Sequence, residues 1–170
     1  QLIHDNLLEA YEHGDNMRAR RNMLSAAYKA GVAFTRSYVG YVHAIAHSLG
    51  GRYGIPHGLA NAIILPHMLR AYGEAATPKL ADLARMAGIA PVNAQDSLAA
   101  EAFIDWIDCM NETLGIPRYV SGIRRSDIPQ MAAHADAEAN PLHPVPLLMD
   151  RLELEHMYEV VAGGMFEDEN

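Results

Sequence analysis

Apolar residues recur every three or four positions along most of the chain, the spacing that places them on one face of a helix. One such stripe comprises Met23, Leu24, Ala27, Tyr28, Gly31 and Phe34. Together with turn and cap residues, the pattern predicts helices over residues 1–13, 17–49, 57–72, 77–87, 95–114, 126–138 and 150–162. No segment alternates strictly enough to be a strand. The sequence therefore predicts an all-α, compact helical bundle that forms a single domain over residues 1–170.

The segment 57–72 is apolar around nearly its whole circumference. Its apolar interior consists of Ala60, Ala62, Ile63, Ile64 and Leu65. Helices of this kind normally lie in the middle of a domain, so we expect this one at the centre of the core. Pro66 removes a backbone donor and predicts a kink, with His67 beyond it and outside any site formed at the start of the helix.

Three histidines flank a predicted turn between two of these helices. His43 and His47 are four residues apart, so they share a helix face. Gly50-Gly51 is expected to end their helix, and Pro56 to start the next one with His57 in its first turn. This order brings His57 opposite His43. Imidazoles that converge from two packed helices commonly hold a divalent transition metal.

The three histidines can also be explained without a metal, as ordinary core or surface residues. A His-x3-His pair occurs often by chance, and a single histidine on an apolar face is usually a satisfied core or surface residue. The pair alone therefore does not establish a metal centre.

Composition narrows the class of protein. Half of the residues are hydrophobic and 20% are charged, which is typical of a packed globular protein and not of a disordered one. The formal net charge of −8 argues against a nucleic-acid surface. No run approaches the roughly 18 apolar residues that span a bilayer. The single cysteine, Cys109, excludes an internal disulfide and fits a reducing cytoplasm.

The histidine-bearing stretch resembles the signature of a known family. VHAIAHSLGG at Val42–Gly51 and PHGLANAIILP at Pro56–Pro66 are similar to the motif of the iron-containing (group III) alcohol dehydrogenases. Leu114–Pro117 and Asn140–Asp150 resemble later parts of the same helical domain. The resemblance implies that this chain is the C-terminal, metal-binding domain, without the N-terminal domain that binds the nucleotide.

The resemblance also implies roles for individual residues. The family holds its metal with one aspartate and three histidines, and the last two histidines correspond to His43 and His57. His47 corresponds to a histidine that faces the nicotinamide and the substrate, which makes it the catalytic, substrate-binding and cofactor-contacting candidate. Phe34 corresponds to a residue that lines the substrate pocket. The other two ligands come from an Asp-x3-His motif upstream of residue 1.

The implied reaction is oxidation of a small-molecule alcohol by metal-assisted hydride transfer to NAD or NADP, which the N-terminal domain mainly binds. Fe²⁺ is the expected metal, and Zn²⁺ suits the same donor set. The larger Arg36 and Tyr38 stand where many members carry small residues, so the substrate alcohol stays open. We expect a cytoplasmic homo-oligomer that binds neither nucleic acid nor a membrane.

Two other hypotheses remain open. The chain is a non-catalytic all-α module or a truncated remnant without activity of its own, or it is a helical metal-binding or interaction protein unrelated to dehydrogenases. Even within the family, only two of the four metal ligands are present. We therefore expect the isolated chain to bind metal weakly and to lack turnover.

Overall fold

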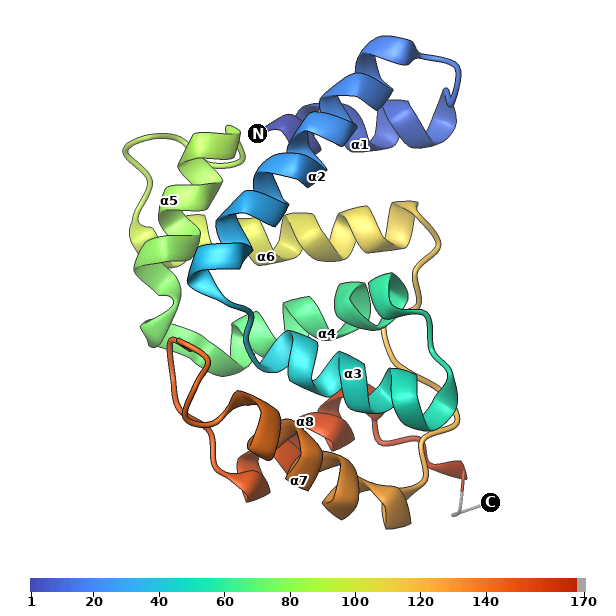
Figure 1. Cartoon of the computed structure of the whole chain (residues 1–170). Helices are drawn as coiled ribbons and strands as arrows, with labels where there is room; N and C mark the ends of the chain where they lie inside the picture. Colours follow the sequence, from blue (N-terminus) through green and yellow to red (C-terminus); the bar gives the residue numbers. More distant parts are fainter. Residues whose placement is uncertain (168–170) are drawn as a thin grey trace.

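The computed structural model describes residues 1–167, and every regular element in this range is helical (Figure 1). The helices are α1 (Leu2–Glu12), α2 (Met17–Ser37), α3 (Tyr41–Tyr53), α4 (His57–Tyr72), α5 (Thr77–Ala87), α6 (Asp96–Thr113), α7 (Ile128–Ala139) and α8 (Arg151–Ala162), with 3₁₀ turns η1 (Gly73–Ala75) and η2 (Arg125–Asp127). The all-α prediction is confirmed. Within the described range, no helix combines the length and apolarity needed to cross a bilayer.

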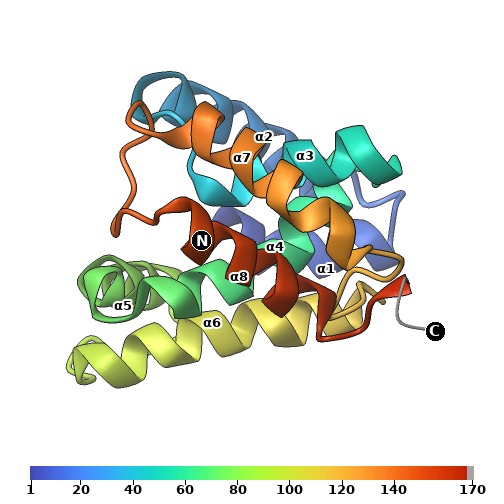
Figure 2. The same ribbon diagram turned by 90° about the horizontal axis from the view of Figure 1, so that it is seen from below.

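Helix α4 lies at the centre of the arrangement. It packs against α3, α6 and α8, and Figure 2 shows it between the α5–α6 pair on one side and α3 with α7 on the other. Ala60, Ile64 and Met68 on α4 have no exposed surface. Helix α4 is apolar on nearly every face because other helices cover it on several sides. The α1–α2 hairpin stands at one end of the molecule (Figure 1).

The predicted continuous helix over residues 17–49 is wrong, because the chain leaves the helical conformation after Ser37. Tyr38 has a φ of +59°, a region that residues with side chains rarely adopt, and Gly40 is extended. A Cβ on Gly40 would lie 3.4 Å from Val145 Cγ1, an ordinary van der Waals distance, so the connector between α7 and α8 packs beside this position. The chain therefore breaks into two helices, and a distant segment lies against the break.

The expected helix end at Gly50-Gly51 is also wrong. Helix α3 continues through both glycines to Tyr53 and ends at Gly54, whose φ is +68° and whose N–H bonds to the Gly50 carbonyl. A Cβ on Gly50 would lie 3.4 Å from the Ile55 carbonyl oxygen, where the chain turns back toward α4. Gly54 thus supplies the left-handed end of α3, and the returning chain packs beside Gly50.

The proline-rich connector over residues 140–149 is non-helical, as predicted, and Tyr41 anchors it. The buried Tyr41 hydroxyl donates to Asn140 Oδ1 at 2.7 Å and accepts from the Met149 N–H at 3.0 Å. Asp150 then begins α8 with a reciprocal capping box to Glu153, which confirms the predicted cap. The start of α3, the end of α7 and the start of α8 are therefore tied together.

Candidate functional site

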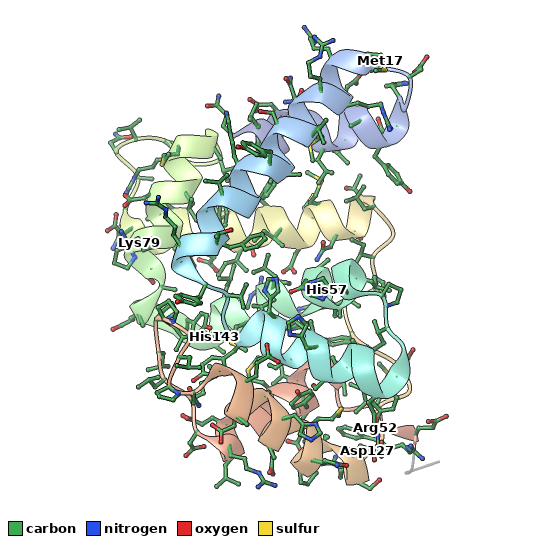
Figure 3. The ribbon with its side chains drawn as sticks, viewed as in Figure 1. Met17, Arg52, His57, Lys79, Asp127 and His143 are labelled. Carbon is green, nitrogen blue, oxygen red and sulfur yellow. The ribbon has the colours of Figure 1, made fainter. Side chains whose placement is uncertain are left out.

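The structure brings the three histidines of the sequence motif together. His43 and His47 lie on α3, and His57 begins α4, at the position labelled in Figure 3. The ring centroids are 5.4 Å apart for His43 and His57, 5.9 Å for His43 and His47, and 5.2 Å for His47 and His57. The reversal at Gly54 places the two helices side by side, so residues fourteen positions apart become neighbours.

His43 is the most enclosed of the three rings. It is half-buried, whereas His47 and His57 are exposed. Burial lowers the pKa of His43, and the neighbouring His57 and His47 lower it further, while Glu138 acts in the opposite direction. The neutral ring that this environment favours is the form that binds a metal.

His57 is supported from its own helix. The Asn61 side chain, one turn further along α4, donates to the His57 carbonyl at 2.8 Å and lies 3.1 Å from the ring Nε2. His57 is the first residue of α4, and the contact from Asn61 ties its backbone to the next turn of the same helix.

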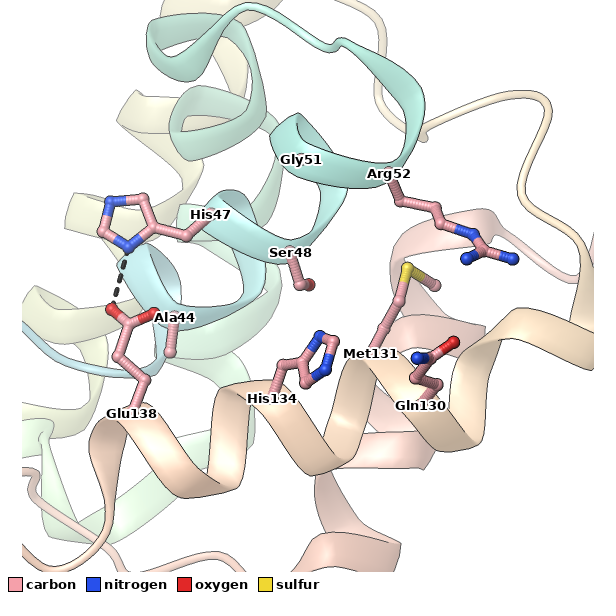
Figure 4. A pocket seen from close by; sticks show the side chains of 9 residues that line it. All are labelled: Ala44, His47, Ser48, Gly51, Arg52, Gln130, Met131, His134 and Glu138. Atoms are coloured by element: carbon pink, nitrogen blue, oxygen red, sulfur yellow. Dashed lines mark hydrogen bonds and ion pairs between the residues drawn. The ribbon is translucent and has the colours of Figure 1, made fainter.

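His47 bonds to a residue from another helix. Its Nδ1 donates to Glu138 Oε1 on α7 at 2.8 Å (Figure 4). The two residues stand at one end of a cavity of about 410 Å³ between α3 and α7, which Ser48, Arg52 and His134 also line.

Two residues that the sequence singled out, Phe34 and His67, need a separate account. Phe34 is exposed on α2, and its substrate role stays a prediction. His67 is buried, and its Nε2 contacts the Arg118 carbonyl at 2.9 Å while its ring stacks on Tyr119. These contacts give His67 a structural role outside the histidine cluster.

Sequence reasoning missed two residues near the cluster. Glu138 is 91 positions from His47, and only the packing of α7 on α3 joins them. His143, in the proline-rich connector, lies near enough to His43 to lower its pKa. The His143 Nδ1 atom is buried without a hydrogen-bond partner among the described residues. No local motif in the sequence marks either residue.

The donor set fits a divalent metal only in part. Because metal–nitrogen bonds are about 2.0–2.1 Å long, two imidazoles that share a tetrahedral ion have centroids about 5 Å apart. The 5.4 Å between the His43 and His57 rings is of this size. Over residues 1–167, however, no three His, Cys, Asp or Glu side chains are grouped so as to hold an ion. The described part of the chain thus offers half of a tetrahedral donor set.

Comparison with known proteins identifies the class to which this fold and histidine cluster belong. Residues 1–161 match the model of the Fe-containing alcohol dehydrogenase family, C-terminal. The chain therefore belongs to the iron-containing alcohol dehydrogenase family, and it corresponds to the C-terminal part of its members.

Individual relatives agree in sequence and in fold. The chain is 42% identical to 1,3-propanediol dehydrogenase of Citrobacter freundii over 143 residues, covering 82% of this chain and 37% of the relative. It is 36% identical to alcohol dehydrogenase 4 of Saccharomyces cerevisiae, strain YJM789, covering 81% of this chain and 36% of the relative. The crystal structure of a 1,3-propanediol oxidoreductase superposes with a TM-score of 0.87 at 36% identity, covering 94% of this chain and 42% of that one. The chain spans little more than a third of the length of these curated relatives.

Proposed function

We propose that this chain is the metal-binding helical domain of an NAD(P)-dependent, iron-containing alcohol dehydrogenase, which oxidises an alcohol by metal-assisted hydride transfer. The observation that carries the proposal is the convergence of His43 and His57, whose ring centroids are 5.4 Å apart, from two adjacent helices. Family membership supplies the reaction class, and the domain forms one wall of the site.

In this proposal His43 and His57 hold the metal, Fe²⁺ or alternatively Zn²⁺, through neutral ring nitrogens. A divalent ion at this position supplies Lewis-acid polarisation of the alcohol oxygen. The lowered pKa of His43 and the support of His57 by Asn61 favour ligand-competent rings. The missing donors are an aspartate and a histidine supplied from outside residues 1–170.

His47 is the proposed catalytic residue, beside the two ligands and in contact with substrate and nicotinamide. Its exposed ring lies 5.2 Å, centroid to centroid, from that of His57, within reach of a group bound at the metal. From this place it accepts or relays the proton of the alcohol. Phe34 is proposed to line the substrate pocket, and NAD or NADP is held mainly by the N-terminal domain.

The remaining features of the proposal concern the whole protein. The substrate is a small alcohol, and names such as 1,3-propanediol dehydrogenase and lactaldehyde reductase among the relatives show that the family accepts more than one. The formal net charge of −8 argues against nucleic acid as a partner. A homo-oligomer in the cytoplasm is the assembly and location that we expect.

The test is to remove each ring in the complete enzyme and to measure bound metal by elemental analysis beside alcohol-dependent NAD(P)⁺ reduction. We expect His43→Ala and His57→Ala to lose the metal, and activity to fall by more than about 100-fold, the upper end of the cost of removing an outer-shell partner. His47→Ala should keep the metal and lose turnover. His156→Ala, at an exposed position of α8, is the matched control and should change neither quantity.

A His57→Ala protein with full metal content would refute the ligand assignment. Loss of metal from His47→Ala would instead move that ring into the ligand set.

A further inference from the structure

The contact between His47 and Glu138 joins two helices that the sequence separates widely. The Nδ1–Oε1 distance is 2.8 Å, in the range of charge-assisted hydrogen bonds. Both side chains are partly exposed at the end of the α3–α7 cavity, so a bound molecule has access to the ring (Figure 4).

The packing between α3 and α7 holds the two partners in register. Helices α3 and α7 pack against each other, and the core to which both contribute contains buried small side chains, Ala44 on α3 and Ala132, Ala135 and Ala139 on α7. Such residues let the helix backbones approach closely. Just beyond Glu138, the Tyr41–Asn140 hydrogen bond ties the end of α7 to the start of α3. The core therefore fixes the position of α7 relative to α3, and with it the position of the Glu138 carboxylate.

The contact determines which nitrogen of His47 carries the proton. An ionised carboxylate only accepts hydrogen bonds, so Nδ1 must be the donor, and the neutral ring then has its lone pair on Nε2. Figure 4 shows the second ring nitrogen on the side of the ring away from Glu138. Nε2 is thus left free to accept a proton, on a ring that stacks on His57 with an interplanar angle of 19°.

We propose that Glu138 is a positioning residue for His47: through the 2.8 Å contact with Nδ1 it orients the ring and keeps the neutral form in the Nδ1–H tautomer, so that the Nε2 lone pair points away from the carboxylate and can receive the proton of an alcohol. The O–H bond of the alcohol breaks as the N–H bond at Nε2 forms, and the O–H electron pair becomes the second bond of the product carbonyl. The C–H bond of the same carbon breaks, and its electron pair leaves with the hydride to the oxidised nicotinamide. The arrangement follows the acid–histidine logic of hydrolase triads. This inference rests on the proposed function of the chain.

The first experiment needs no activity. In the metal-free 170-residue chain, ¹⁵N spectra of labelled histidines at mildly alkaline pH report which ring nitrogen of His47 is protonated. We expect the Nδ1–H form in the native chain and a shift toward Nε2–H in Glu138→Ala. Glu138→Asp, which keeps the acceptor on a shorter arm, should recover part of the native signature. Glu101→Ala, at an exposed position of α6, is the control and should leave it unchanged.

The second experiment uses the complete enzyme. Glu138→Ala should lower kcat by about 10- to 100-fold, the usual cost of removing a partner that orients a site histidine. We expect KM for the alcohol and the metal content to stay within about twofold, because Glu138 reaches the chemistry only through His47. The kcat of Glu138→Asp should lie between those of the native enzyme and of Glu138→Ala.

An Nε2–H ring in the native chain, or an unchanged kcat in Glu138→Ala, would overturn the positioning role. Failure of the proposed function has a different signature. In that case His43→Ala keeps metal and activity, or the complete enzyme shows no alcohol oxidation. The catalytic inference then falls with the proposed function, even if the tautomer depends on Glu138.

Discussion

Asp127 is a buried carboxylate that gathers donors from two segments of the chain. It is 7% exposed and accepts from Arg52, from the Tyr53 hydroxyl at 2.8 Å and from Arg124 Nε at 3.3 Å. The hydrogen bond from Arg52 lowers the pKa of Asp127 below its ordinary value, and the contacts with Tyr53 and Arg124 act in the same direction. These contacts fasten the last turn of α3 to the turn that precedes α7.

Because the pKa of Asp127 is lowered on folding, the carboxylate stabilises the native state above its unfolded pKa of about 3.9, and this contribution is lost as the pH falls through the folded value. We expect Asp127→Asn to lower the free energy of unfolding at pH 7 by about 0.5–1.5 kcal/mol, since the partly exposed Arg52 and Arg124 lose a charged acceptor but stay accessible to water. Urea denaturation at pH values between 7 and 3 should show that the difference in free energy of unfolding between the native and Asp127→Asn proteins becomes smaller as the pH falls. Asp82→Asn, in an exposed pair with Arg85, is the control and should change little at any pH.

At the scale of elements, the central helix α4 contains a proline that its neighbour compensates. Pro66 has no N–H to donate to the Ala62 carbonyl one turn earlier. The Asn111 side chain on α6 donates to that carbonyl instead, at 2.8 Å. The proline that interrupts the hydrogen bonding of α4 thus creates a polar link between α4 and α6.

This link predicts non-additive mutations. Asn111→Ala should cost about 1–3 kcal/mol of stability, because the Ala62 carbonyl is left without a donor. Pro66→Ala restores a backbone N–H at that place, so Asn111→Ala should cost clearly less in the Pro66→Ala background. Chemical denaturation of the four proteins of the double-mutant cycle measures the coupling. Strictly additive effects would show that the carbonyl does not need its side-chain donor.

At the scale of the whole molecule, α2 carries an exposed apolar stripe. Met17, Leu24, Tyr28 and Val32 follow one another at helical spacing, and each is more than half exposed. Exposed apolar patches of this kind commonly mark surfaces that another domain or subunit covers. The expectation of a homo-oligomer stays a prediction, and the stripe is a surface that suits one.

The isolated 170-residue chain should show no alcohol-dependent NAD(P)⁺ reduction and should lose added Fe²⁺ or Zn²⁺ readily to a chelator. Two histidines leave half of a tetrahedral coordination sphere to water, and correct positioning of reactants can account for roughly 7–11 kcal/mol of a barrier. The assay is absorbance of the reduced nicotinamide with a panel of alcohols, beside equilibrium dialysis of the metal. Turnover, or metal retained against chelator, would show that residues 1–170 contain a complete site.

Sequence alone determined the features that depend on neighbouring residues. Helical spacing and the cap at Asp150 predicted the helical elements, because side-chain periodicity and end groups act within a few turns. Likewise, the spacing of His43, His47 and His57 around a glycine turn predicted that two helices would present them together. The family resemblance, now supported by the match over residues 1–161, rested on the same local motif.

Only the tertiary structure decided the features in which distant segments meet. Val145 packs beside the break at Gly40, and the continuity of α4 through Pro66 is accompanied by a donor from α6. His47 contacts a carboxylate 91 positions away. The end of the described range shows the same effect: Phe166 is 4% exposed, and the Glu167 N–H bonds to the Ile123 carbonyl. Local periodicity specifies which face of a helix is apolar, but not which neighbour covers it. That choice depends on packing and hydrogen bonding across the whole chain, and here it places Glu138 beside His47.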